Sequence, residues 1–187
     1  MALKATIFKA LVQLSDMDRN LYGDYPLTIA RHPSETDERM LIRLLALALN
    51  VPSNDGQGML EFAKDMWDAD EPAIWQKDLT GQITHWIEVG QPDERRLSRA
   101  CSRVGRVSVY SFGTSTPVWW KGIEPALSRI RNLSAWQIPA EQSRALSVLA
   151  QRSMELQVTV QEGSVWVGDG DRSIEVSPVR LCGDAGK

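Results

Sequence analysis

The sequence has few cysteines and histidines, no long apolar run and no large excess of one charge. Only two of its 187 residues are cysteine and two are histidine, and Cys101 and Cys182 do not form a CxxC pair. This argues against a zinc site and a disulfide framework, and we expect both thiols to be reduced in a bacterial cytoplasm. The longest apolar run, 44–49, is far shorter than the roughly 20 residues of a membrane span. Segment 1–14 is interrupted by polar residues and lacks the apolar stretch of a signal peptide.

The charges of the chain nearly balance, since 21 Lys and Arg stand against 24 Asp and Glu, for a net charge of −3. Such a chain has no global positive field, which excludes binding to nucleic acid in the manner of histones or ribosomal proteins. The 43% of hydrophobic residues and seven tryptophans argue against disorder. A chain of this length buries a substantial core. We therefore expect one monomeric domain over residues 1–187, with a frayed tail over about 182–187 and no association with a membrane.

The first part of the chain is predicted to form two strands and a buried helix. Two β-prone stretches separated by a polar turn over 15–20 indicate antiparallel strands over 2–14 and 21–31. A helix is expected from the N-cap Ser34 to about Asn50. Because this helix is apolar on two faces, it should be buried on two sides. The later segment 59–67 fits a helix or a strand.

The rest of the chain is predicted to alternate helices with strands and to end in a β-meander over 155–176. The predicted helices cover 92–104, 118–132 (with Pro125 dividing it into two pieces) and 139–152. The predicted strands between them cover 107–112 and 133–138. Because strands and helices interleave without a strict β-α-β period, the predicted fold class is α/β (mixed α+β), with a central mixed β-sheet flanked by helices.

A hairpin over 73–89 has the most informative spacing. A turn at Thr80-Gly81 pairs residues whose numbers sum to 161, which places Trp75 opposite Trp86 and Ala73 opposite Glu88. Opposed side chains share one face of a sheet, with Cβ atoms about 4.5–5.5 Å apart. Two acids at these positions would suit a divalent cation, but Ala73 leaves Glu88 without that partner. The tryptophan pair is interpreted as packing.

Several motifs over nearly the whole chain resemble the YaeQ family: RHPSETDER at 31–39, DEPAIWQKDLTG at 70–81, WIEVGQPDER at 86–95 and VWW at 118–120. The resemblance implies a restriction-endonuclease-like fold, similar to the PD-(D/E)XK nucleases, which hydrolyse phosphodiesters with Mg²⁺. In those nucleases one strand of a hairpin carries an Asp after Pro, and the next carries an acid followed by Lys. Here Glu88 matches the second acid, whereas Ala73 and Gly90 stand where the Asp and Lys belong.

The resemblance implies a catalytic and metal site around Glu88. Gln91 and Arg95 are expected to lie near it, to position a phosphate and to stabilise its charge. Further acids are candidates to complete a Mg²⁺ site with Glu88: Glu35, Glu38, Asp70 and Glu71. The alternative for each acid is a partner of a helix dipole or a solvated loop charge.

Arginines form a stripe on the helix predicted over 92–104. Arg95, Arg99 and Arg103 recur every four residues, and Arg96 lies beside them. Like charges at this spacing repel each other, so an unpaired stripe indicates a polyanion or an acidic partner, and arginine suits bidentate contact with phosphate. The alternative is ion pairing with nearby acids. Two functions remain open: a divergent Mg²⁺-dependent nuclease, and an inactive nuclease-fold module that binds nucleic acid or a protein through these arginines.

Overall fold

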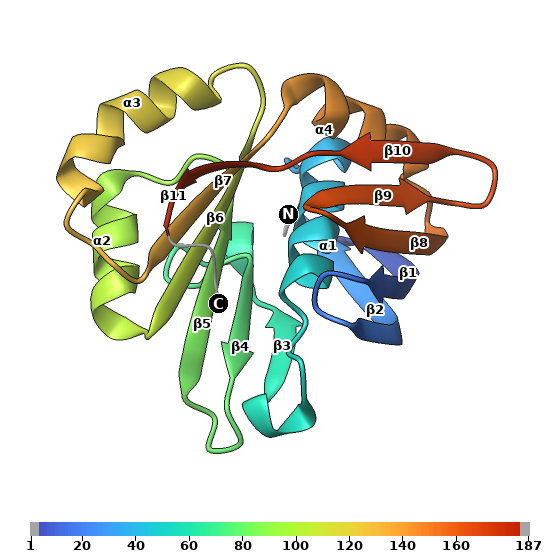
Figure 1. The fold of residues 1–187 in the computed structure, drawn as a ribbon, viewed down its shortest axis with the longest axis horizontal. Coiled ribbons are helices and arrows are strands. Elements are labelled where there is room, and N and C mark those ends of the chain that lie inside the picture. The colour runs from blue at the N-terminus through green and yellow to red at the C-terminus, as the bar shows by residue number, and fades with distance from the viewer. Residues whose placement is uncertain (1–3, 184–187) are drawn as a thin grey trace.

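In the computed structural model, which describes residues 4–183, one helix lies between two β-sheets (Figure 1). The helices are α1 (Asp37–Asn50), α2 (Glu94–Arg103), α3 (Thr116–Leu127) and α4 (Ala140–Leu146). The strands are β1 (Thr6–Asp16), β2 (Leu21–Arg31), β3 (Met59–Phe62), β4 (Ile74–Lys77), β5 (Ile83–Val89), β6 (Arg106–Phe112), β7 (Leu133–Ile138), β8 (Ser153–Gln161), β9 (Ser164–Gly168), β10 (Ser173–Val176) and β11 (Val179–Cys182).

The strands form a five-stranded sheet of order β10-β9-β8-β1-β2 and a six-stranded sheet of order β11-β7-β6-β5-β4-β3. Both sheets are mixed, because β1 runs parallel to β8 and β6 runs parallel to β5 and β7, whereas β1 is antiparallel to β2 and β4 to β5. The α/β class is thus confirmed. The expectation of one central sheet is corrected to two, because β1 pairs with β8 instead of joining the sheet of the hairpin.

Helix α1 is buried because both sheets pack against it. Every residue from Met40 to Ala48 is buried, and the apolar ones form the larger core with strands of both sheets. The predicted burial on two sides is therefore confirmed. Helices α2 and α3 pack on the other face of the six-stranded sheet, where they enclose a second core (Figure 1).

Helix α1 begins later than predicted. Its N-cap is Thr36, whose Oγ1 accepts a hydrogen bond of 3.1 Å from the Arg39 N–H. Ser34 lies in the preceding turn, which is closed by a 2.9 Å bond from the Glu35 N–H to the His32 carbonyl. A Ser in that turn cannot cap the helix, so the prediction of Ser34 as the N-cap was wrong.

Other boundaries also differ from the predictions. Helix α2 has Asp93 as its N-cap, and Pro92 lies before it instead of in the first turn. Helix α3 starts at Thr116 and continues through Pro125 to Leu127 as one piece, so the predicted division at Pro125 was wrong. Helix α4 ends at Leu146, and a 3₁₀ turn over Ser147–Leu149 follows it directly.

The predicted register of the hairpin is confirmed at Ile74–Ile87, Trp75–Trp86 and Gln76–His85. A bulge then pairs Lys77 with Ile83. Strand β4 begins one residue after Ala73, which is fully buried. Segment 59–67 divides into strand β3 and a 3₁₀ turn over Asp65–Trp67.

The C-terminal part of the chain is mostly as predicted. The predicted C-terminal meander is confirmed as β8–β10, whereas Cys182 is not frayed but lies in β11, paired with β7. The remainder of the predicted tail, 184–187, and the start of the first predicted strand lie outside the described residues. Both cysteines are free thiols, and burial raises the pKa of Cys101 to about 11. Over residues 4–183, no helix is long and apolar enough to cross a membrane.

Glycine is required at position 58, between α1 and β3. Gly58 has a φ of +89°, and a Cβ there would overlap the carbonyl oxygen of Lys77. We expect Gly58→Ala to lower the free energy of unfolding by more than about 1 kcal/mol, because alanine strains this backbone and displaces β3 from β4. The exposed Gly122 of α3, with open space around it, is the control, since alanine there should raise stability by up to about 1 kcal/mol. Urea denaturation measures both effects, and an equally stable Gly58→Ala variant would contradict the argument.

Candidate functional site

A cavity of about 430 Å³ lies beside Glu88, at the end of β5. Its lining combines Glu88, Gln91 and Arg96 with Arg39 from α1 and Asp65 from the 3₁₀ turn that follows β3. Three of the site residues predicted from the sequence, Glu88, Gln91 and Arg96, therefore line the same cavity. Arg39 and Asp65 were missed. Arg39 ends the motif at 31–39, but that motif did not assign it a role, and Asp65 lies outside every motif.

The Glu88 carboxylate is buried and bonded within the protein. The residue is 4% exposed, and its Oε1 accepts hydrogen bonds from the Trp86 Nε1–H at 2.7 Å and the Arg96 Nε–H at 2.6 Å. Burial raises the pKa of the Glu88 carboxyl above its ordinary value, and the Arg96 cation and the Trp86 indole only partly offset that effect. Trp86, which lies opposite Trp75 in the hairpin, therefore has a polar role as the hydrogen-bond donor to Glu88.

Arg96 uses its guanidinium to join Glu88 to the loop before β4. Besides the bond to Glu88, its Nη1 donates to the Ala69 carbonyl and its Nη2 donates to the Glu71 carbonyl at 2.7 Å. For Arg96, ion pairing with a nearby acid is therefore the correct alternative. Arg96 therefore differs from the other arginines of α2, because its donors are already engaged inside the protein.

Glu35 belongs to a buried network of charges at the start of α1. Its carboxylate accepts two 2.7 Å hydrogen bonds from Arg43 and one of 2.8 Å from Arg39. Arg39 also donates to both carboxylate oxygens of Asp65, at 2.6 and 2.9 Å. Two arginines thus neutralise two acids, and the network attaches α1 to the segment after β3.

The other predicted acids have separate partners. Glu38 accepts a 2.5 Å hydrogen bond from Ser143 of α4, and Glu71 is bound by the backbone N–H and the ammonium group of Lys64 at 2.9 and 3.2 Å. The side chain of Asp70 is 81% exposed and lies 3.9 Å from Arg99.

The arrangement of these donors does not fit the predicted Mg²⁺ site. Magnesium requires several oxygen ligands in octahedral geometry. Glu35 and Glu88 are instead bonded to arginines, and within residues 4–183 no three His, Cys, Asp or Glu side chains are grouped in a way that could hold a metal ion. The buried carboxylates of Glu35 and Glu88 are neutralised by protein cations and do not offer a metal its ligands.

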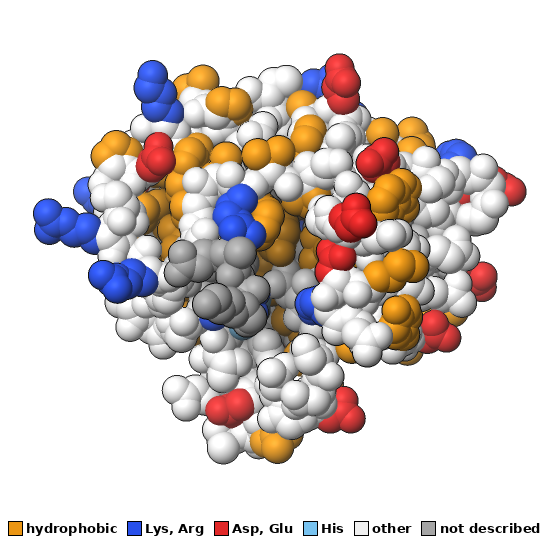
Figure 2. All heavy atoms as spheres, in the orientation of Figure 1, with side chains coloured by type: hydrophobic (Ala, Val, Ile, Leu, Met, Phe, Trp, Pro, Cys, Tyr) orange, Lys and Arg blue, Asp and Glu red, His pale blue; other side chains and the backbone are white. Residues whose placement is uncertain are grey.

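The remaining arginines of α2 face outward. Arg95, Arg99 and Arg103 are exposed, whereas Leu97 and Ala100 are buried against the sheet. Figure 2 shows Lys and Arg side chains on the flank formed by α2 and α3, while acidic side chains lie on the opposite flank, over α4 and the five-stranded sheet. Gln91 lies near this flank and donates a 2.8 Å hydrogen bond to Ser115.

Removal of Arg96 should make stability depend on the ionisation of Glu88. In Arg96→Met the carboxyl loses its cation, so its pKa in the folded protein rises further. A group with a raised pKa binds protons more tightly when folded, so the free energy of unfolding is highest below the pKa of the unfolded chain and falls as the pH rises through the folded-state pKa. We expect a loss of about 3 kcal/mol relative to the parent protein at pH 8, and a smaller loss at pH 4.

Urea denaturation at the two pH values measures this effect. The double variant Arg96→Met/Glu88→Gln is the control, because it has no carboxyl to ionise and should not show the additional loss at high pH. An equal loss at both pH values in Arg96→Met would contradict the argument.

Comparison with known proteins identifies the family. The family model described as "YaeQ protein" matches residues 1–178. The chain is 40% identical to "Uncharacterized protein YaeQ" of Escherichia coli (strain K12) over 178 residues, which are 95% of this chain and 96% of that protein. It resembles the crystal structure of YaeQ protein from Xanthomonas axonopodis pv. citri with a TM-score of 0.90 at 40% identity, covering 97% of this chain and 100% of that chain. For the YaeQ protein of Pseudomonas syringae the TM-score is 0.90 at 38% identity, covering 97% and 98%. The chain described here therefore belongs to the YaeQ family.

Proposed function

We propose that this protein is a catalytically inactive module of nuclease-like descent that binds nucleic acid through the exposed arginines of α2. The proposal includes a monomeric protein in the bacterial cytoplasm, where DNA and RNA are accessible. The observation that carries it is that the arginines of α2 have two different roles. Arg96 turns inward to neutralise Glu88, whereas Arg95, Arg99 and Arg103 face outward.

The descent rests on the sequence resemblance and on the position of Glu88. The hairpin β4–β5 presents Glu88 beside α2, and α1 contributes Arg39 to the same cavity. The motif acids and the first helix would converge in this way in a PD-(D/E)XK-type nuclease. Fold alone does not assign an activity, so the chemistry of the side chains decides between an active and an inactive site.

That chemistry disfavours hydrolysis with Mg²⁺. A metal-dependent nuclease needs carboxylates that can bind the metal, which then activates a water molecule. Here Arg96 occupies the position next to Glu88 that such a cation would require. Gly90, in the place of the motif Lys, has a φ of +112°, a conformation that a lysine would adopt only with strain.

Nucleic acid is the partner that best fits the outward-facing stripe. Arg95 and Arg103 lie about 12 Å apart along the helix at 1.5 Å per residue. The contact of Arg99 with Asp70 is long and exposed, so it contributes little to stability and leaves the guanidinium available. Arginine forms bidentate bonds with phosphate oxygens, and a polyanion would relieve the repulsion along the stripe.

Binding can be tested with matched charge variants. Arg95→Gln/Arg99→Gln/Arg103→Gln should weaken binding roughly tenfold or more and make the log–log salt dependence shallower by about 2 to 3, because three phosphate contacts are lost. The control replaces three exposed cations outside α2 and α3, Lys9→Gln/Arg144→Gln/Arg152→Gln, which changes the net charge equally.

Fluorescence anisotropy with labelled single-stranded DNA, duplex DNA and RNA measures both quantities. The control variant should bind like the parent protein. Absence of binding to all three probes, or an equal loss in the two triple variants, would refute the assignment of nucleic acid to α2.

Catalysis is tested separately with the same nucleic acids and added Mg²⁺ or Mn²⁺. We expect no more cleavage by the parent protein than by Glu88→Gln, because the carboxylate is bonded to Arg96. Thermal unfolding of the variant shows whether it remains folded under the assay conditions. Robust cleavage that a folded Glu88→Gln variant has lost would establish a nuclease and overturn the inactive-site proposal.

A further inference from the structure

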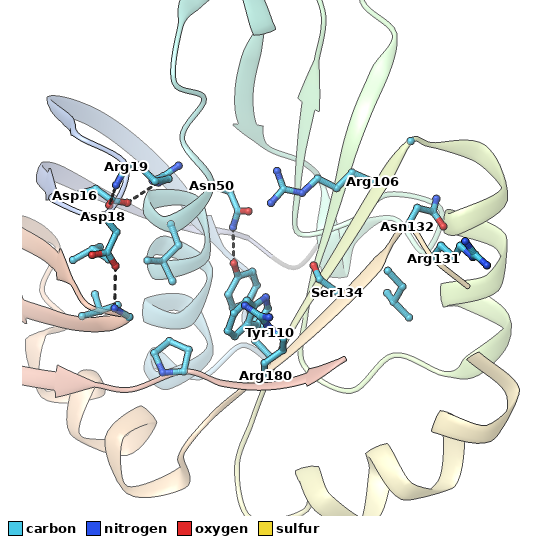
Figure 3. Close-up of a pocket in the computed structure, with 18 residues that line it drawn as sticks. Asp16, Asp18, Arg19, Asn50, Arg106, Tyr110, Arg131, Asn132, Ser134 and Arg180 are labelled. Atoms are coloured by element: carbon cyan, nitrogen blue, oxygen red, sulfur yellow. Dashed lines mark hydrogen bonds and ion pairs between the residues drawn. The ribbon is translucent and has the colours of Figure 1, made fainter. Parts of the chain in front are cut away.

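A second and larger cavity, of about 620 Å³, lies between the two sheets at the C-terminal end of α1 (Figure 3). It shares no lining residue with the cavity beside Glu88. Arg39 lines the first cavity and Asn50 the second, and these residues are roughly 16 Å apart along the helix at its normal rise. The larger cavity is therefore a separate site, and its role is independent of the function proposed for α2.

The charged residues of this cavity leave an excess of positive charge. Four arginines and two aspartates line it: Arg19, Arg106, Arg131, Arg180, Asp16 and Asp18. Arg19 is engaged, because its Nε donates to Asp16 at 2.6 Å and its Nη1 to the Val51 carbonyl at 2.8 Å. The Asp18 carboxylate accepts two backbone N–H groups, from Glu162 and Gly163, at 2.7 and 2.9 Å.

The other three arginines have no such partners. Over residues 4–183, no ion pair is formed by Arg106, Arg131 or Arg180. Figure 3 shows the Arg106 side chain extending toward Asn50 across the cavity. Arg180 lies over the ring of Trp136 at 4.8 Å, so the indole supports its guanidinium. The cavity thus offers cations to a ligand from more than one side.

The wall of the cavity also has hydrogen-bonding groups with spare capacity. Asn50 donates one amide hydrogen to the Ala46 carbonyl at 2.7 Å and the other to the Tyr110 hydroxyl at 2.8 Å. Both amide hydrogens are therefore used, and in residues 4–183 no donor binds the Asn50 amide oxygen and no acceptor binds the Tyr110 hydroxyl hydrogen. Burial raises the pKa of Tyr110, so the hydroxyl remains a donor near neutral pH.

A third polar group, Ser134, belongs to a chain of hydrogen-bonded side chains. Its Oγ lies 3.0 Å from that of Ser108, which lies 2.8 Å from the His85 Nε2. Burial lowers the pKa of His85 to about 3, so the imidazole is neutral and the chain of hydrogen bonds adds no charge to the cavity. The net positive charge therefore comes from the arginines alone.

We propose that this cavity binds a small phosphate-bearing ligand of about mononucleotide size. Its volume lies within the roughly 300–1,000 Å³ of typical small-molecule sites. Arg106 and Arg180 would bind the phosphate, because arginine is suited to phosphate geometry. Trp136 and Tyr110 provide aromatic surface for an organic portion, while Asn50 and Tyr110 provide one acceptor and one donor.

Calorimetry with defined probes tests the proposal. With adenosine 5′-monophosphate as the probe, we expect a dissociation constant below about 1 mM, and adenosine should bind roughly tenfold or more weakly, because it lacks the phosphate. Inorganic phosphate should also bind more weakly than the nucleotide, because it makes no contact with the aromatic surface. The variant Arg106→Gln/Arg180→Gln should weaken binding of the nucleotide roughly tenfold.

The matched control is Arg144→Gln/Arg152→Gln, which removes two exposed arginines that do not line the cavity. It should bind the nucleotide like the parent protein. Each of three results would overturn the proposal: no binding of the nucleotide, adenosine binding as tightly as the nucleotide, or equal weakening by the two double variants. Phosphate binding as tightly as the nucleotide would overturn the role of Trp136 and Tyr110.

Discussion

A carboxylate that is removed from water needs a cation beside it, and the region around the hairpin is organised by that requirement. Glu88 and Glu35 are each at most 5% exposed, and each is bonded to arginine. The arginines also attach neighbouring elements, because Arg96 holds the loop before β4 and Arg39 holds Asp65. The same bonds that neutralise the acids therefore fix α2 to the hairpin and α1 to the segment after β3.

Helix geometry determines which arginine of α2 neutralises Glu88. With 3.6 residues per turn, Arg96 lies on the side of α2 that also carries the buried Ala100, so it can reach Glu88. Arg95, Arg99 and Arg103 lie on the adjacent face and remain exposed. A net charge of −3 is thus an average over unlike surfaces, in which a basic helix is offset by acids elsewhere. The net charge excludes attraction of polyanions to the whole surface, but it does not exclude binding of a polyanion to α2.

Local patterns predicted much of the fold, whereas pairings distant in the sequence were not predictable. The sum of 161 gave the hairpin register because a tight turn relates residue numbers directly. The pairing of β1 with β8 joins residues such as Gln13 and Gln157, and no local pattern specifies it. Ser34 failed as a cap because His32 and Glu35 close a local turn just before the helix, and residue preferences do not distinguish a Ser in such a turn from an N-cap. Asp65 escaped notice because a single acid in an irregular segment has no periodicity.

The two cavities at the ends of α1 show why the neutralised site is the poorer candidate for binding an anion. Beside Glu88, Arg39 and Arg96 are matched by Asp65 and Glu88, so the lining has no excess charge. An entering phosphate would have to break those bonds and leave buried carboxylates without cations, which is costly. Between the sheets, the lining has four arginines and only two aspartates, and within residues 4–183 only Arg19 is paired with one of them, so an anion can bind there without separating an existing ion pair. Glu88 and the arginine bonded to it thus stabilise the fold, and the cavity with the excess of arginines contains neither of these residues.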